Sequence, residues 1–264
     1  MDTAQPRSRS VPAGIAVLAA VGALFVSLPL LALLVRTPWS DLAGSLSRSG
    51  AWTALRVSLV VSLAAAALSV LLGVPLAFVL ARSRVPGRAL LRAVALLPLV
   101  LPPVVGGIAL LAALGRSGLI GRWLAHVGIQ LTFTMAGAVL ATTFVSMPLV
   151  VLATESGLRA LPLGFQDAAR AAGASRMYTL RRVTLPMIRS QILAGAVLAW
   201  ARALGEFGAT ITFAGNLRGR TQTLPLSVFV AQQTDPGGAL ATSLILVVVS
   251  VTVLVLMRKR LFAA

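Results

Sequence analysis

The sequence predicts an all-α membrane protein with six transmembrane helices. Its 264 residues are 58% hydrophobic and 11% charged, with a mean hydropathy of +0.95, whereas a soluble domain has about 25% charged residues. Apolar segments of about 20 residues, long enough to cross a bilayer, recur along the chain. Positive charge gathers at the ends of these segments, which is its placement when it sets membrane orientation.

Six segments have the length and composition of a transmembrane helix. The predicted spans are residues 11–35, 55–81, 93–114, 133–153, 190–213 and 239–257. The first is too long for the apolar region of a signal peptide, so we expect it to be retained. The second contains Pro75 and the fourth Pro148, which neighbouring helices can accommodate in a membrane. We therefore expect a single transmembrane domain over residues 1–264.

The third span is rich in proline and glycine, reading LPLVLPPVVGG from Leu97 to Gly107. Transmembrane helices tolerate such residues where neighbours satisfy the freed backbone groups. The alternative is a kinked, locally open stretch that lines a path. The residues alone leave both interpretations open.

Lysine and arginine are divided unequally between the two sets of connections. Fifteen of the 23 lie in the N-terminal arm, the 82–92 loop, the central loop and the C-terminus, and seven lie in the alternate connections. The richer side of a multi-pass protein faces the cytoplasm. We expect both termini in the cytoplasm and the chain in the cell membrane. The net charge of +17 is therefore interpreted as orienting charge, and no nucleic-acid partner is expected.

A polar segment over residues 154–189 interrupts the apolar pattern. Its middle, Gln166 to Pro186, reads QDAARAAGASRMYTLRRVTLP. The clustered alanine and glycine predict a pair of short helices outside the membrane, with a smooth surface that another backbone can approach closely. Such a surface is useful mainly for docking.

The spacing in this segment resembles the EAA loop of ABC importer permeases. The matching positions are Asp167, Ala168, Ala169, Gly173, Val183, Leu185 and Pro186. Asp167 replaces the usual glutamate and Val183 the usual isoleucine, and both keep the charge or the shape. In that family the ATPase grips the membrane subunit at this loop. The resemblance implies a type I importer permease fold with a cytoplasmic coupling-helix loop over about residues 154–189.

Arg202 and Glu206 lie one turn apart within the fifth predicted span. Ionisable residues in a membrane are costly and indicate function by default, whereas the alternative is an ion pair that merely makes both groups tolerable. Neutral donors follow at Gly208, Thr210, Thr212 and Asn216. We expect these six residues to line a path along which a tetrahedral oxyanion passes from donor to donor; ordinary helix packing is the alternative.

Three further stretches resemble the molybdate/tungstate branch of these permeases. They are Leu96–Gly107, Ala201–Asn216 and Gly219–Phe229. The sequence GEFGA within the second is shared with the sulfate branch, so a sulfate or thiosulfate permease is the alternative. The resemblance implies import of molybdate, with tungstate as a possible second cargo.

The resemblance also implies partners: a second copy of the chain, two ABC ATPase subunits and an extracytoplasmic molybdate-binding protein. An ATP site of its own is not expected, because a P-loop needs GxxxxGK followed by Ser or Thr and Lys259 is the only lysine. With one histidine, His126, and no cysteine, neither a metal site nor a cofactor is expected. A stand-alone ion-coupled carrier is less expected, since no internal repeat is evident and Glu206 is the only acidic residue well inside a predicted span. A membrane-embedded enzyme is less expected still.

Overall fold

The structure is a computed structural model that describes residues 12–83, 85–162 and 164–261. Every regular element in these ranges is helical. In chain order they are α1 (Ala13–Arg36), η1 (Trp39–Asp41), α2 (Leu42–Ser49), α3 (Ala51–Arg82), α4 (Arg88–Leu96), η2 (Leu97–Leu99), α5 (Pro103–Leu114), α6 (Gly121–His126), α7 (Met135–Ala160), α8 (Gly164–Ala171), α9 (Arg176–Thr179), η3 (Leu180–Thr184), α10 (Leu185–Met187), α11 (Arg189–Leu204), α12 (Gly208–Ala214), α13 (Leu224–Thr234) and α14 (Pro236–Leu261). The all-α class is confirmed. Three of the arginines counted for membrane orientation, Arg7, Arg9 and Arg84, lie outside the described residues.

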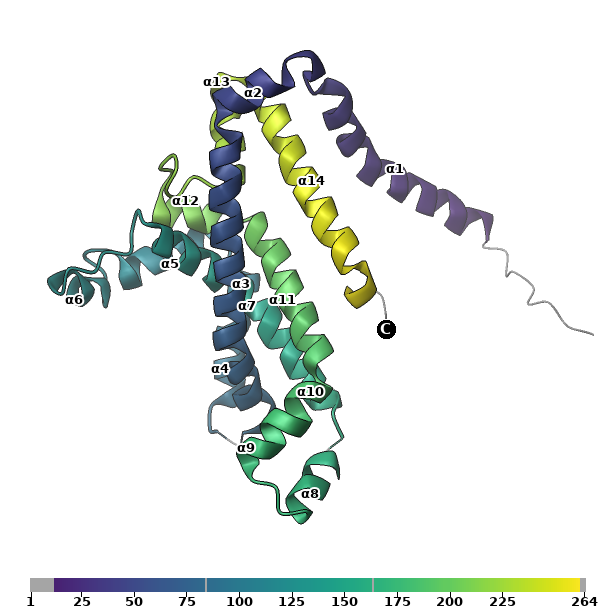
Figure 1. The fold of residues 1–264 in the computed structure, drawn as a ribbon, viewed down its shortest axis with the longest axis vertical. Coiled ribbons are helices and arrows are strands. Elements are labelled where there is room, and N and C mark those ends of the chain that lie inside the picture. Colours follow the sequence, from purple (N-terminus) through teal and green to yellow (C-terminus); the bar gives the residue numbers. More distant parts are fainter. Residues whose placement is uncertain (1–11, 84, 163, 262–264) are drawn as a thin grey trace, which may run out of the picture.

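The core of the molecule is the packing of α3, α7 and α11, which run side by side along its long axis (Figure 1). Small residues let these helices approach closely. A Cβ added at Gly195 on α11 would lie 2.9 Å from the Cβ of Ala153 on α7. Between α3 and α7, the hydroxyls of Ser69 and Ser146 are 3.2 Å apart in the interior. Small residues and buried hydroxyl pairs hold helices together where lipid removes the hydrophobic force between them.

Four described helices are long and apolar enough to cross a membrane. They are Ala13–Arg36, Ala51–Arg82, Met135–Ala160 and Pro236–Val253. Two bent helix pairs raise the number to six if each pair is one span. The chain is a multi-pass membrane protein. Helix α7 contains most of the fourth predicted span, residues 133–153, and continues beyond it to Ala160.

The third predicted span, residues 93–114, is sharply bent. Arg88–Leu99 and Pro103–Leu114 meet at 118°, and α5 leaves the long axis toward α6 (Figure 1). Pro102 and Pro103 lie at the bend, where each lacks a backbone N–H and restricts the residue before it. The stretch is therefore kinked, and its role in lining a path stays a prediction.

The fifth predicted span, residues 190–213, is divided into two helices. Helix α11 ends at Leu204 and α12 begins at Gly208. At its other end, α11 meets the preceding helical stretch, Arg176–Met187, at 66°. Helices α8 to α10 lie at one end of the molecule, and α2 and α13 at the other (Figure 1). The functional residues predicted from sequence are thus distributed over two regions, the α8–α10 end and the α11–α12 break.

Candidate functional site

The predicted pair of short helices is present at the α8–α10 end of the molecule. Gly173 ends α8 with φ +79°. Its N–H donates to Arg170 O at 2.9 Å, and Ala174 N–H donates to Ala169 O at 3.0 Å. This pair of bonds is a left-handed helix end, which glycine adopts without the cost that a Cβ imposes. Gly173 therefore suits the turn, which most residues with a side chain would adopt only with strain.

The second short helix starts at a side-chain cap. Ser175 Oγ accepts a hydrogen bond from Tyr178 N–H at 3.2 Å, which satisfies one of the free donors at the start of α9. Gln166 Nε2 donates to Thr184 Oγ1 at 3.4 Å and so links α8 to η3. The two helices thus form a defined unit beyond the spans.

The outer face of this unit is open. Of the seven motif positions, Asp167, Ala168, Gly173 and Pro186 are exposed, and Ala169, Val183 and Leu185 are half-buried. A Cβ at Gly173 would meet nothing within 4 Å. Three large apolar side chains are exposed beside them, at Phe165, Met177 and Tyr178. We call the exposed set Phe165, Asp167, Ala168, Gly173, Met177 and Tyr178 the docking surface. Exposed apolar side chains rimmed by charge are typical of an interaction site.

Arg202 and Glu206 meet where α11 breaks into α12. Arg202 Nη1 lies 2.6 Å from Glu206 Oε2, and the Glu206 side chain is 1% exposed against 33% for Arg202. Glu206 Oε1 also accepts a hydrogen bond from Ala209 N–H at 2.9 Å. The carboxylate therefore caps α12 while it pairs with α11, because free N–H groups and positive dipole charge gather at a helix start. In this arrangement the pair joins two helices.

The neutral residues of the predicted path pack between α12 and its neighbours. Thr210 is fully buried, with its hydroxyl 3.4 Å from that of Thr142 on α7. A Cβ at Gly208 would lie 2.9 Å from Pro103 Cβ on α5. Thr212 Oγ1 donates to Gly208 O at 2.8 Å. The structure brings these residues together with Arg202 and Glu206 at the α11–α12 break, where Thr210 and Gly208 also approach α7 and α5.

Asn216 lies just beyond α12 and is half-buried. Its Oδ1 is buried without a hydrogen-bond partner. The predicted path set thus contains two buried oxygens without a hydrogen bond, Asn216 Oδ1 and Glu206 Oε2, and the second of them is paired in charge with Arg202.

Glu155 is a buried acidic residue that the sequence interpretation missed. It lies on α7, where the predicted span had already ended, and its side chain is 2% exposed. Arg159 Nη2 lies 2.7 Å from Glu155 Oε1, and Arg92 Nε on α4 lies 3.3 Å from Oε2. Glu206 is therefore not the only acidic residue inside a helix of the bundle. Glutamate four residues before arginine is the favourable order for a helical ion pair, and this signal could have extended the predicted helix.

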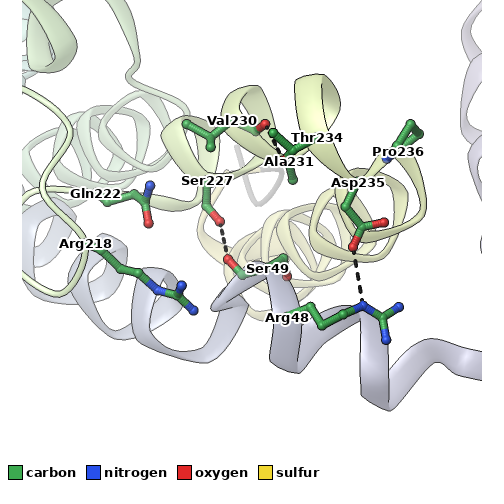
Figure 2. A pocket seen from close by; sticks show the side chains of 10 residues that line it. All are labelled: Arg48, Ser49, Arg218, Gln222, Ser227, Val230, Ala231, Thr234, Asp235 and Pro236. Atoms are coloured by element: carbon green, nitrogen blue, oxygen red, sulfur yellow. Dashed lines mark hydrogen bonds and ion pairs between the residues drawn. The ribbon is translucent and has the colours of Figure 1, made fainter.

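A pocket of about 610 Å³ lies at the α2–α13 end (Figure 2). Arg48 and Arg218 face it together with Ser49, Gln222, Ser227 and Asp235. Arg48 contacts two carboxylates, Asp41 at 2.6 Å and Asp235 at 3.7 Å. The hydrogen bond and charge of Asp41 raise the pKa of Arg48. The positive charge of this pocket is largely balanced, so it is a poor trap for an anion.

Within the described ranges, no three His, Cys, Asp or Glu residues are grouped so that they could hold a metal ion. His126 Nδ1 lies 2.6 Å from Arg122 O on the same helix, α6. Its ring is therefore held locally.

The family described as binding-protein-dependent transport system inner membrane component matches residues 69–260 of the chain. The molybdenum transport system permease protein ModB of Mycobacterium tuberculosis is 48% identical over 237 residues, 89% of each chain. ModB of Escherichia coli K12 is 46% identical over 71% of this chain and 82% of its own. The sulfate transport system permease protein CysW of Synechococcus elongatus is 41% identical over 66% of this chain and 61% of its own.

Among solved structures, a chain of a bacterial ABC transporter involved in the import of the acidic polysaccharide alginate superposes with a TM-score of 0.72. The match covers 93% of both chains at 17% identity. At that identity, the likeness concerns the fold.

Proposed function

The chain belongs to the family of binding-protein-dependent transport system inner membrane components, and on that premise we propose that it is the membrane-spanning permease subunit of an ATP-driven importer of molybdate. The observation that carries the proposal is the docking surface on α8 and α9, which stands beyond the spans with its glycine turn and helix cap in place. A permease needs such a surface because its energy comes from another subunit.

The partner at the docking surface is an ABC ATPase, present as a dimer below two copies of this chain. Small residues at Ala168 and Gly173 permit close backbone approach, and Phe165, Met177 and Tyr178 provide apolar area for burial. ATP-driven closure of the ATPases would move α8 to α10 and, through the 66° joint, α11. A change of this kind requires contacts that differ between two states, which a rigid helix pair can supply.

A second copy of the chain covers α5, and the substrate path follows the axis between the copies. Helix α5 carries exposed apolar side chains at Val104 and Ile108, and Val100 at the bend is 84% exposed. Irregular backbone is tolerated at membrane depth only where protein or a water-filled cavity surrounds it. Beside such an axis, protein or water would surround the irregular backbone at the bend before α5 and at the break between α11 and α12. Arg202, Glu206 and Asn216 would then support or border the path.

The cargo is molybdate, with sulfate as the second candidate. The ModB relatives of Mycobacterium tuberculosis and Escherichia coli are 46–48% identical to this chain, against 39–41% for two CysW sulfate relatives. An extracytoplasmic binding protein delivers the anion at the α2–α13 end. The arginine-rich α8–α10 end faces the cytoplasm, as the distribution of positive charge requires. The chain itself performs no ATP hydrolysis.

The test is ATP hydrolysis by this chain co-purified with its candidate ATPase in liposomes, with binding protein added in its molybdate-loaded or sulfate-loaded form. We expect stimulation by the molybdate-loaded form alone. Equal stimulation by the sulfate-loaded form would overturn the assignment of molybdate as the cargo and would leave the assignment as a permease standing. Failure of the ATPase to co-purify would overturn the docking proposal.

A further inference from the structure

A second pocket, of about 600 Å³, lies between α4 and the end of α7. Helix α4 lies toward the α8–α10 end of the molecule (Figure 1). It is lined by Arg88, Ala89, Arg92, Ala93, Leu96 and Arg159. We call it the arginine pocket. Neither the docking surface nor the α11–α12 break includes any of its residues.

Positive charge in the arginine pocket is not balanced by the described residues. Glu155 is the one carboxylate among them that pairs here, with Arg92 at 3.3 Å and Arg159 at 2.7 Å. Arg88 donates to Ser83 O at 3.2 Å and forms no ion pair with a described carboxylate. Three guanidinium groups therefore face one carboxylate, in contrast to the charge-balanced pocket at the α2–α13 end. The site favours an anion.

The pocket wall changes from charged to apolar along α4. Arg88, Arg92 and Leu96 are spaced by four residues and so share one face of the helix, with Ala89 and Ala93 beside them. Arg88 begins α4, Arg92 lies at its middle, and Leu96 ends it, packed against a buried cluster of the bundle. A bilayer also changes from charged to apolar, from its headgroups at the surface to its acyl chains inside. Arginine beside apolar residues is also the composition of helices that lie at a membrane surface.

From this arrangement we infer that the arginine pocket binds the phosphate headgroup of an anionic phospholipid from the cytoplasmic leaflet. The inference rests on the orientation in the proposed function. A free oxyanion offers the same phosphate-like chemistry, but the alanine and leucine wall has no side-chain donors to surround it, whereas it suits a glycerol backbone and the first acyl carbons. Basic pockets between helices on the cytoplasmic side are suited to anionic headgroups. The bound lipid joins α4, which leads into the bend, to α7, which leads into the docking surface.

The experiment uses the full chain co-purified with its ATPase in mild detergent, exchanged into phosphatidylglycerol or phosphatidylcholine, with retained lipid counted by native mass spectrometry. We expect selective retention of phosphatidylglycerol. Arg88→Gln, which leaves the Glu155 pairs in place, should weaken retention about fivefold, since one basic residue near an anionic surface is worth about that factor. Ala93→Trp should abolish retention by filling the pocket without a change of charge.

The matched control is Arg189→Gln, which removes an exposed arginine at the same end of the molecule but outside the pocket. It should retain phosphatidylglycerol like the unaltered chain. Equal loss in Arg189→Gln and Arg88→Gln would overturn the inference, as would retention without lipid preference. Displacement of the lipid by submillimolar inorganic phosphate or molybdate would assign the pocket to a free oxyanion instead. Lipid retention is measured without transport. A loss of lipid selectivity would therefore leave the proposed import of molybdate standing, and a failure of import would leave the lipid site standing.

Discussion

At the scale of single residues, Gly173 meets two requirements at once. Its left-handed φ of +79° ends α8, and the space in front of it is empty. The first requirement concerns folding of the loop and the second concerns access by a partner. The two can be separated, because asparagine tolerates the left-handed conformation far better than other residues with a side chain.

We predict that Gly173→Trp prevents the ATPase from co-purifying and abolishes molybdate uptake, because the indole occupies the open space of the docking surface. Gly173→Asn is the control and should keep most co-purification. Both variants should be compared by pull-down of the ATPase from detergent. Normal ATPase association in the tryptophan variant would remove the docking surface from the account.

Glu206 holds the α11–α12 break together, so its replacement should lower stability. Glu206→Ala removes both the pair with Arg202 and the cap on Ala209 N–H. We expect a loss of about 2 kcal/mol, from the cap and from a pair whose arginine is one-third exposed. Glu206→Gln keeps an acceptor for the cap and should lose less. The measurement is thermal melting of the purified protein, and equal melting of all three forms would contradict the structural role.

Of the two buried carboxylates, Glu206 was identified from the sequence and Glu155 was not. The Arg202–Glu206 pair followed from a spacing of four inside an apolar segment. Glu155 did not, because arginine at 159 and the following polar run suggested that the span had ended. The pair of Glu155 with Arg159 has a local signal in its spacing of four. Its pair with Arg92 comes from a distant part of the chain, and such a tertiary contact has no local signal.

At the scale of elements, the two breaks in the bundle have different causes. The bend before α5 follows from adjacent prolines and could be anticipated. The break between α11 and α12 has no proline: it depends on Glu206 capping the new helix and on Gly208 packing against Pro103. Packing of this kind is decided by neighbours, so the sequence favoured one continuous span.

The α5–α12 contact is close enough to test with one small apolar substitution. A Cβ at Gly107 would lie 2.6 Å from Thr212 Cβ and 3.1 Å from the backbone oxygen of Ala209. Gly107→Val should therefore destabilise the protein by about 1–3 kcal/mol through overpacking. Gly14→Val on α1, where nothing lies within 4 Å, is the control. A melting temperature for Gly107→Val equal to that of the control would show that α5 and α12 do not pack as described.

At the scale of the whole molecule, hydropathy alone indicated where the long apolar helices lie, while four of them and two bent helix pairs stand where six spans were predicted. Helices α3, α7 and α14 include most of the predicted second, fourth and sixth spans. The short helices α2, α6 and α13 in the connections were not predicted. They are too brief for a clear periodic signal. Helices α2 and α13 pack against α3 and α14, and α6 contacts α5.

Orientation can be tested directly because the chain contains no cysteine. We predict that a cysteine at Ala172 is modified by a membrane-impermeant maleimide only from the cytoplasmic side, and one at Ser47 only from outside. Both positions are exposed. Right-side-out vesicles expose the outer face to the maleimide, and inside-out vesicles expose the cytoplasmic face. The opposite labelling pattern would reverse the topology and with it the place of the ATPase.

The most direct test of the central claim is molybdenum uptake into proteoliposomes that contain this chain and its ATPase, with ATP enclosed and molybdate-loaded binding protein outside. Molybdenum in the washed vesicles is measured by elemental mass spectrometry. We expect accumulation that requires ATP, the binding protein and both subunits, and that is lost in Gly173→Trp. Accumulation by this chain without ATPase or ATP would contradict the account and indicate a self-sufficient carrier.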